Sequence, residues 1–152
     1  MSGYQEVLTD PSYARQIVTM TSPQQGNYGT NRDDAESDVV RVAGFVVREV
    51  ARRPSNWRNE RGLGELLAAA GVPGIEGIDT RALTLRLRDA GAMRAAISTE
   101  DLDAASLVER VRTSAGMEGA DLAAGVSCEG PWEAASLVGP ASTTRGRVHR
   151  VA

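Results

Sequence analysis

The stretch that decides the fold runs from residue 39 to residue 50 and reads Val39-Val40-Arg41-Val42-Ala43-Gly44-Phe45-Val46-Val47-Arg48-Glu49-Val50. Its β-branched and aromatic residues favour a pleated surface, so we predict a strand over residues 43–50. A second β-branched run, Gln-Ile-Val-Thr-Met-Thr at residues 16–21, predicts another strand. The segment between them, residues 22–38, is polar and predicts a loop. Its glycines and asparagines at residues 26–31 tolerate positive φ angles.

Helical periodicity begins downstream of this strand. Leucines and alanines spaced at i, i+3, i+4 and i+7 predict a helix over residues 63–70, which a glycine and a proline then end. Asp79 and Thr80 are good N-cap residues for a second helix, and Gly91 is a natural residue just beyond its C-terminus.

Further elements are predicted on both sides of these helices. Residues 92–98 predict a strand, and residues 101–114 predict a third helix, with one more helical turn before Ala124. Residues 4–15 are polar and turn-rich, with a turn at Asp10-Pro11-Ser12 because proline presets φ. The mixed order of strands and helices predicts an α/β (α+β) class.

The amino-acid composition of the sequence changes from Gly125 onward. Gly-Pro pairs and a Ser/Thr-rich segment are typical of a linker. Residues 147–152 then resemble the beginning of a strand.

Composition excludes several function classes. The chain has 152 residues with 20 acidic and 17 basic side chains and a net charge of −3, and every basic residue is arginine. A nucleic-acid binder needs surplus positive charge on one face, so we expect no nucleic-acid partner. Without lysine, neither a Lys-type phosphate loop nor Schiff-base catalysis can be formed.

Sequence features also indicate a compartment. A single cysteine cannot form an internal disulfide, which is typical of a reducing environment. No apolar run approaches the roughly 20 residues of a membrane span. The first residues lack the basic and apolar segments of a secretory signal. We therefore expect a cytoplasmic, soluble protein without a membrane partner.

Residues with catalytic or metal-binding chemistry are sparse. Cys128 and His149 could form a nucleophile–base pair, but both fall in the linker-like region, so an inert thiol and an exposed imidazole are favoured. The acidic run at residues 33–38 could bind a cation, although a solvated loop or helix start is favoured because no EF-hand spacing follows. The trio Asp79-Thr80-Arg81 could be catalytic, but helix capping explains its first two residues. The residues alone predict no catalytic and no metal site.

Several short motifs, each weak alone, are informative when their order and spacing are considered together. They are Met1-Ser2-Gly3-Tyr4-Gln5-Glu6, Leu8-Thr9-Asp10-Pro11-Ser12-Tyr13, Arg15-Gln16-Ile17-Val18, Gly26-Asn27-Tyr28-Gly29-Thr30-Asn31 and Gly77-Ile78-Asp79-Thr80-Arg81-Ala82-Leu83-Thr84. The series resembles the N-terminal domain of the small (glutaminase) subunit of carbamoyl phosphate synthetase. The likeness runs from Met1 to about Ala124.

This resemblance implies a fold and a division of the chain. The family domain is a layered β/β/α arrangement of the swivelling type. In the family the Met-x-Gly-Tyr-Gln-Glu stretch follows the strands that open the domain, so we expect the domain to be incomplete at the N-terminus and the chain to be truncated at both ends. Residues 1–124 correspond to the partial N-terminal domain and residues 125–147 to a linker. Residues 148–152 correspond to the start of a glutamine amidotransferase domain that is absent.

The resemblance also implies an activity, that of a ligase. The family's small subunit hydrolyses glutamine to ammonia, which a large subunit combines with bicarbonate and ATP to make carbamoyl phosphate for arginine and pyrimidine biosynthesis. The family's Thr-Asp-Pro-Ser-Tyr turn carries a serine that contacts the bound glutamine, and this serine maps onto Ser12. The alternative is that the Ser12 hydroxyl only stabilises its turn. The resemblance implies no catalytic residue here, because the Cys/His/Glu triad belongs to the amidotransferase domain.

Partners and cofactors follow from the same resemblance. We expect a heterodimer with the large subunit, and no cofactor in this chain, because ATP and metal are bound by the large subunit. These residues would serve subunit and domain packing and would have no glutaminase activity of their own. The alternative is a non-catalytic interaction module that binds a synthetase large subunit.

Overall fold

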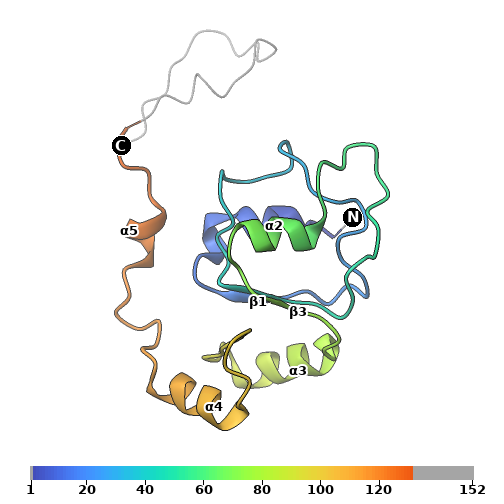
Figure 1. Cartoon of the computed structure of the whole chain (residues 1–152). Helices are drawn as coiled ribbons and strands as arrows, with labels where there is room; N and C mark the ends of the chain where they lie inside the picture. The colour runs from blue at the N-terminus through green and yellow to red at the C-terminus, as the bar shows by residue number, and fades with distance from the viewer. Residues whose placement is uncertain (1, 132–152) are drawn as a thin grey trace.

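The computed structural model describes residues 2–131 and confirms the α/β class (Figure 1). The order of elements mixes helices with a three-stranded parallel sheet of order β1-β2-β3. The elements are α1 (Tyr4–Thr9), a 3-10 helix (Pro11–Tyr13), β1 (Ile17–Thr19), β2 (Gly44–Val46), α2 (Leu63–Ala69), β3 (Gly74–Ile75), α3 (Thr80–Ala90), α4 (Ala104–Thr113) and α5 (Leu122–Val126).

The strand predicted at residues 43–50 is the centre of the sheet. β2 is buried along its whole length, with Phe45 opposite Val18 of β1 and Gly74 of β3. The strand is shorter than predicted because Arg48 and Glu49 are exposed. Burial on both faces is typical of a central parallel strand, whose sequence is continuously apolar.

Helices lie on both sides of the sheet. α1 and α2 lie on one side of it, and α3 and α4 lie on the other (Figure 1). The core forms on the α1–α2 side. Its buried members are Tyr4, Leu8, Val42, Phe45, Val47, Leu63, Leu66 and Leu67.

The short helix α1 was not predicted, and this part of the turn-rich assignment of residues 4–15 is wrong. α1 buries Tyr4, Gln5, Leu8 and Thr9, so tertiary packing stabilises a helix that has no cap from a side chain. Isolated helices of this length are unstable in water, because the helix propensity of so few residues is not sufficient. Burial of an amphipathic face provides the missing stabilisation. The turn predicted at Asp10-Pro11-Ser12 is confirmed as the start of the 3-10 helix.

The helices predicted from periodicity are confirmed. The Asp79 carboxylate accepts a hydrogen bond from the Ala82 N–H at 2.9 Å and caps α3, which ends before Gly91 at φ 79°. α4 begins later than predicted because Asp103 is its N-cap, and Leu102 stays outside the helix. The helical turn predicted before Ala124 is α5, which extends to Val126 and so into the segment assigned to the linker.

The strand predicted at residues 92–98 is wrong. The segment has no regular secondary structure, and the residues at 92–96 are exposed. Ile97 and Ser98 are half-buried, and Ile97 lies beside Gly44, where a Cβ atom would lie 3.0 Å from its Cδ1. Ile97 is the single β-branched residue of this segment, and its side chain packs against the sheet. The strand start predicted at residues 147–152 lies outside the described residues. Among the helices of residues 2–131, none is long and apolar enough to cross a membrane.

Candidate functional site

Ser12 lies in the turn that joins α1 to β1. The turn closes on itself through hydrogen bonds from the Tyr13 N–H to the Asp10 carbonyl at 3.1 Å and from the Ala14 N–H to the Pro11 carbonyl at 3.1 Å. The Gln16 amide donates to the Ser12 carbonyl at 2.9 Å. Ser12 is thus held in place by hydrogen bonds on both sides.

The side chain of Asp10 organises the same turn. Its Oδ1 accepts a hydrogen bond from the Ser12 N–H at 2.8 Å. This bond, followed by the approach of the Ser12 hydroxyl, holds the pKa of the Asp10 carboxyl below its usual range. Ser12 itself is exposed, and its hydroxyl makes no hydrogen bond of full geometry with any described residue. The hydroxyl is therefore accessible to a ligand while the Asp10 carboxylate fixes the backbone beneath it.

The turn is anchored to the sheet on its far side. The Ala43 N–H donates to the Gln16 carbonyl at 2.8 Å, and the Arg15 N–H donates to the Arg41 carbonyl at 3.3 Å. Arg15 has a φ of 62°, the only positive φ among the described non-glycine residues. A left-handed conformation at an arginine is uncommon and is retained only where the surrounding bonds determine it.

The loop at residues 26–31 packs into the core and has a structural role. The rings of Tyr4 and Tyr28 stack with their centroids 4.3 Å apart. The Tyr4 hydroxyl donates to the Gly29 carbonyl at 2.5 Å, and burial raises the pKa of Tyr4 above its usual range. Gln5 brackets the next peptide, because its amide nitrogen donates to the Asn31 carbonyl and its amide oxygen accepts from the Asn31 N–H.

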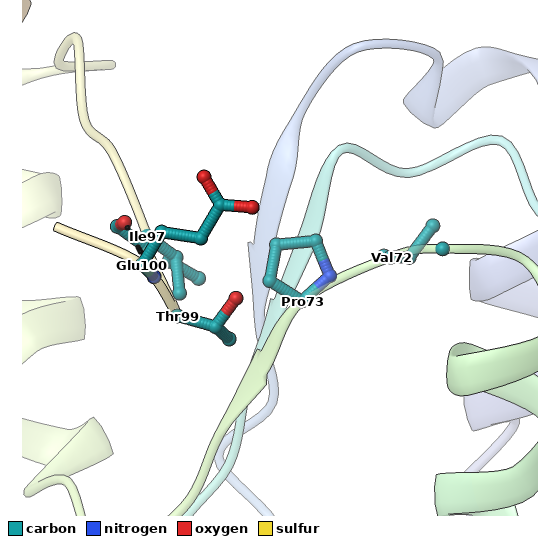
Figure 2. A pocket seen from close by; sticks show the side chains of 7 residues that line it. Val72, Pro73, Ile97, Thr99 and Glu100 are labelled. Atoms are coloured by element: carbon teal, nitrogen blue, oxygen red, sulfur yellow. Dashed lines mark hydrogen bonds between the residues drawn. The ribbon is translucent and has the colours of Figure 1, made fainter.

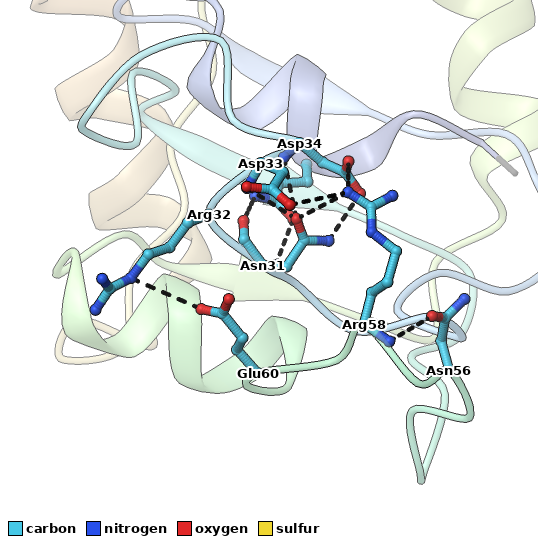
Figure 3. Close-up of polar contacts among 8 residues, drawn as sticks. Asn31, Arg32, Asp33, Asp34, Asn56, Arg58 and Glu60 are labelled. Carbon is cyan, nitrogen blue, oxygen red and sulfur yellow. Dashed lines mark hydrogen bonds and ion pairs between the residues drawn. The ribbon is translucent and has the colours of Figure 1, made fainter.

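The acidic run at residues 33–38 is a loop whose second carboxylate is already paired (Figure 3). Asp34 accepts from the Asn31 amide at 2.7 Å and from the Arg58 guanidinium at 2.7 Å. These two donors, Asn31 first, hold the pKa of Asp34 below its usual range. Arg58 also lies 3.6 Å from Asp33. No group of three metal-ligating side chains occurs among the described residues. The run is thus tied to the loop of Arg58 through Asp34.

The structure describes only some of the other candidates for chemistry. Cys128 is exposed, and His149 lies outside the described residues. Asp79 caps α3, which confirms the capping interpretation of the Asp79-Thr80-Arg81 trio.

An open hollow of about 410 Å³ lies beside the sheet, on the side of residues 97–100 (Figure 2). Its walls are the turn after α2 and the segment that was predicted as a strand. Val72 and Pro73 face Ile97, Thr99 and Glu100 across it. Glu100 is the only ionisable side chain of the lining, so the hollow offers polar contacts but no acid–base pair.

Two features of the protein surface, both in loops, were not predicted from the sequence. One is the pairing of Arg58 with Asp34, which joins segments 24 residues apart. No local pattern indicates such a pair. The other is Trp57, which is 91 % exposed. Its position in a polar stretch without apolar neighbours is the signal that could have indicated it.

Comparison with known proteins identifies the relatives of this chain. Residues 1–97 match the family model described as "Carbamoyl-phosphate synthase small chain, CPSase domain". Three curated relatives carry the name "Carbamoyl phosphate synthase small chain". The relative from Nitratidesulfovibrio vulgaris is 56 % identical over 132 residues, which are 87 % of this chain and 35 % of the relative.

The second relative, from Thermotoga maritima, is 55 % identical over 127 residues, covering 84 % of this chain and 32 % of the relative. The third, from Streptomyces coelicolor, is 54 % identical over 129 residues, which are 84 % of this chain and 34 % of the relative. The chain therefore spans about a third of the length of the relatives it matches.

Proposed function

The chain belongs to the carbamoyl-phosphate synthase small chain family, and we propose that it serves glutamine-dependent carbamoyl phosphate synthesis as a packing and substrate-contacting part of a small chain. The observation that carries the proposal is the family match over residues 1–97. This span contains the whole apolar core and the Ser12 turn.

The proposed reaction has two parts on two chains. The small chain hydrolyses glutamine to glutamate and ammonia. A large chain then uses the ammonia with bicarbonate and ATP, and the carbamoyl phosphate feeds arginine and pyrimidine biosynthesis. We place ATP and metal on the large chain, since this sequence has no lysine for a Lys-type phosphate loop. The lone cysteine supports a cytoplasmic location for the assembly.

Ser12 is proposed to position glutamine. A hydroxyl on a rigid turn can donate to or accept from the polar groups of an amino acid without entering the chemistry. Two features support the assignment: the exposure of Ser12, and a turn that the Asp10 carboxylate and backbone bonds hold together. If Ser12 only stabilised its turn, its removal would affect folding and not the affinity for glutamine.

These residues by themselves are proposed to lack glutaminase activity. Cys128 is the only thiol of the sequence, and it is exposed rather than set beside a base among the described residues. We further propose the division into residues 1–124, the linker 125–147 and residues 148–152 at the edge of an amidotransferase domain. The layered β/β/α arrangement of the swivelling type is proposed for the complete domain, and the parallel sheet supports the α/β class alone.

Binding to the large chain is the first test. The 152-residue chain is titrated into a purified cognate large chain by isothermal calorimetry, and ammonia release from glutamine is followed in parallel. We expect saturable binding and no ammonia above a protein-free control. Absence of binding at low salt would contradict the proposed partnership, and ammonia release would contradict the proposed inactivity.

Ser12 is tested in a chain that carries the catalytic part. In a chimera, these residues replace the matching third of the Thermotoga maritima relative. Loss of one neutral hydrogen bond is expected to raise the KM for glutamine about 3- to 10-fold in Ser12→Ala. Carbamoyl phosphate synthesis from added ammonia stays unchanged. Ser114→Ala, at another exposed serine, is the control. An unchanged KM in Ser12→Ala would refute the substrate contact.

A further inference from the structure

Trp57 is the most exposed of the large apolar side chains that the structure describes. It leaves 91 % of its surface in solvent, whereas tryptophan is highly buried on average in folded proteins. Tryptophan is also the residue most enriched among the anchors of protein–protein interfaces. An indole left uncovered in this way calls for an explanation outside the chain's own core.

The turn that carries Trp57 is rigid. Within it, the Arg58 N–H donates to the Asn56 Oδ1 at 2.8 Å, and the Asn59 N–H donates to the Asn56 carbonyl at 3.1 Å. Before it, the Ser55 N–H donates to the Asn27 carbonyl at 2.7 Å. The Arg58 guanidinium reaches Asp34 across the neighbouring loop (Figure 3). Trp57 is therefore presented on a preorganised support, which lowers the entropy lost on binding.

The surroundings of Trp57 have the opposite charge to the chain as a whole. Residues 48–61 contain five arginines and two glutamates, although the chain has a net charge of −3. Arg52 and Arg53 are exposed, and no acidic side chain among the described residues lies within 4.0 Å of either. A partner seated here meets an aromatic anchor and two exposed guanidinium groups of the same loop, and charge complementarity requires carboxylates on the partner's surface.

We propose that the loop of residues 51–61, the Trp57 loop, is a surface by which this chain docks on the large chain of its synthase. Trp57 fills an apolar pocket of the partner, and carboxylates at the rim of that pocket pair with Arg52 and Arg53. The inference rests on the proposed function, because it takes the partner from there and adds the docking surface and its chemistry. Nucleic acid and membranes are disfavoured as occupants, since one short loop on an acidic chain supplies too few cations for either.

The central test compares two exposed apolar residues. Trp57→Ala is expected to weaken binding to the large chain by about 30-fold or more, the loss typical of an interface anchor. Leu102→Ala removes a side chain that is 83 % exposed outside the loop and is expected to leave the Kd unchanged. Trp57→Phe, which keeps an aromatic ring, is expected to recover part of the affinity. Circular dichroism of each variant reports whether it folds.

The charge component is tested by salt dependence. The double variant Arg52→Ala/Arg53→Ala is expected to lower the association rate about 3- to 10-fold at low ionic strength, with the difference vanishing at high salt. Arg81→Ala/Arg86→Ala removes two exposed arginines from α3 and is the matched control. Equal effects of the two double variants would overturn the proposed role of Arg52 and Arg53.

A spectroscopic readout does not depend on any Trp57 variant. In a Trp132→Phe background Trp57 is the only tryptophan, and its emission maximum is expected to shift to the blue when the large chain is added. If the large chain binds without this blue shift, or if Trp57→Ala binds it with unchanged affinity, the docking surface is overturned and the proposed partnership stays intact. Absence of binding by the unmodified chain overturns both. The same blue shift with anionic vesicles alone, or with rising concentration of this chain alone, assigns the loop to another occupant and overturns the proposal.

Discussion

The two parts of the chain are stabilised in different ways. All the described buried apolar side chains lie between Tyr4 and Leu67, in what we call the N-terminal region, residues 2–79. In the C-terminal region, residues 80–131, α4 and α5 contain no buried residue and α3 buries Thr80 alone.

In the C-terminal region the helices are stabilised by local hydrogen bonds and not by burial of side chains. An aspartate side chain caps each of its three helices, by accepting the Ala82, Ala105 and Ala124 N–H groups at 2.9 to 3.0 Å. Such a cap contributes about 1 kcal/mol, whereas a buried leucine contributes several times more. Global stability is therefore expected to reside in the N-terminal region.

The same substitution in the two regions is expected to give the largest contrast. Leu8→Ala removes a side chain with no exposed surface from the core and is expected to lower the free energy of unfolding by about 2–5 kcal/mol. Leu102→Ala, with 83 % of its surface exposed, is expected to change it by less than about 0.5 kcal/mol. Urea denaturation followed by circular dichroism measures both. Similar losses for the two variants would show that the C-terminal region has a core of its own.

A pair of glycines sharpens the comparison at the level of a single contact. Gly29 and Gly119 have positive φ angles of 72° and 78°, so an alanine is strained at either position. A Cβ atom at Gly29 would lie 1.7 Å from the Asn59 Oδ1, whereas nothing lies within 4 Å at Gly119. Gly29→Ala is therefore expected to cost about 1–3 kcal/mol more than Gly119→Ala. Equal shifts in denaturation midpoint would mean that Asn59 moves away without cost.

Acid stability is expected to show a smaller difference. The Asn31 amide and Arg58 hold the pKa of Asp34 below its ordinary value, so the folded state favours the carboxylate. The resulting stability is present above pH about 4, the unfolded pKa, and is lost as the pH falls through the lower folded pKa. Asp34→Asn should remove this acid dependence. Asp89→Asn, which breaks the exposed pair with Arg88 on α3, is the control. Thermal melts from pH 6 to pH 2 should separate the two variants, and parallel curves would refute the contribution of Asp34.

The same division explains what the sequence could predict. α3 follows from periodicity and its capping aspartate, and α4 follows from periodicity, because these determinants lie within the helices and at their ends. α1 could not be predicted, since its six residues are helical through burial of Tyr4 and Leu8 against distant segments. The prediction of a strand at residues 92–98 failed for another reason: three of these seven residues are alanines, which are depleted in strands, and Ile97 is the only β-branched one.

Prediction of the candidate site was limited in a similar way. The sequence indicated the Asp10-Pro11-Ser12 turn, because the rules for turns are local. The exposure of Ser12 depends on how the turn packs against the rest of the chain, which the order of residues does not determine. The pairing of Arg58 with Asp34 and the exposure of Trp57 depend on how two loops meet. Such contacts between distant segments require a structure.

The parallel sheet has a consequence for how fast the chain folds. Ile17 pairs with Gly44, and Phe45 pairs with Gly74, so neither strand pair can close through a tight turn. Each pairing requires closure of a loop of more than two dozen residues before any ladder bond is gained, and the loop from β1 to β2 contains no helix to shorten it. Because pairing at such separation slows folding, the β2-α2-β3 unit, whose connection is shortened by α2, is expected to form first, and β1 would join it in the slower step.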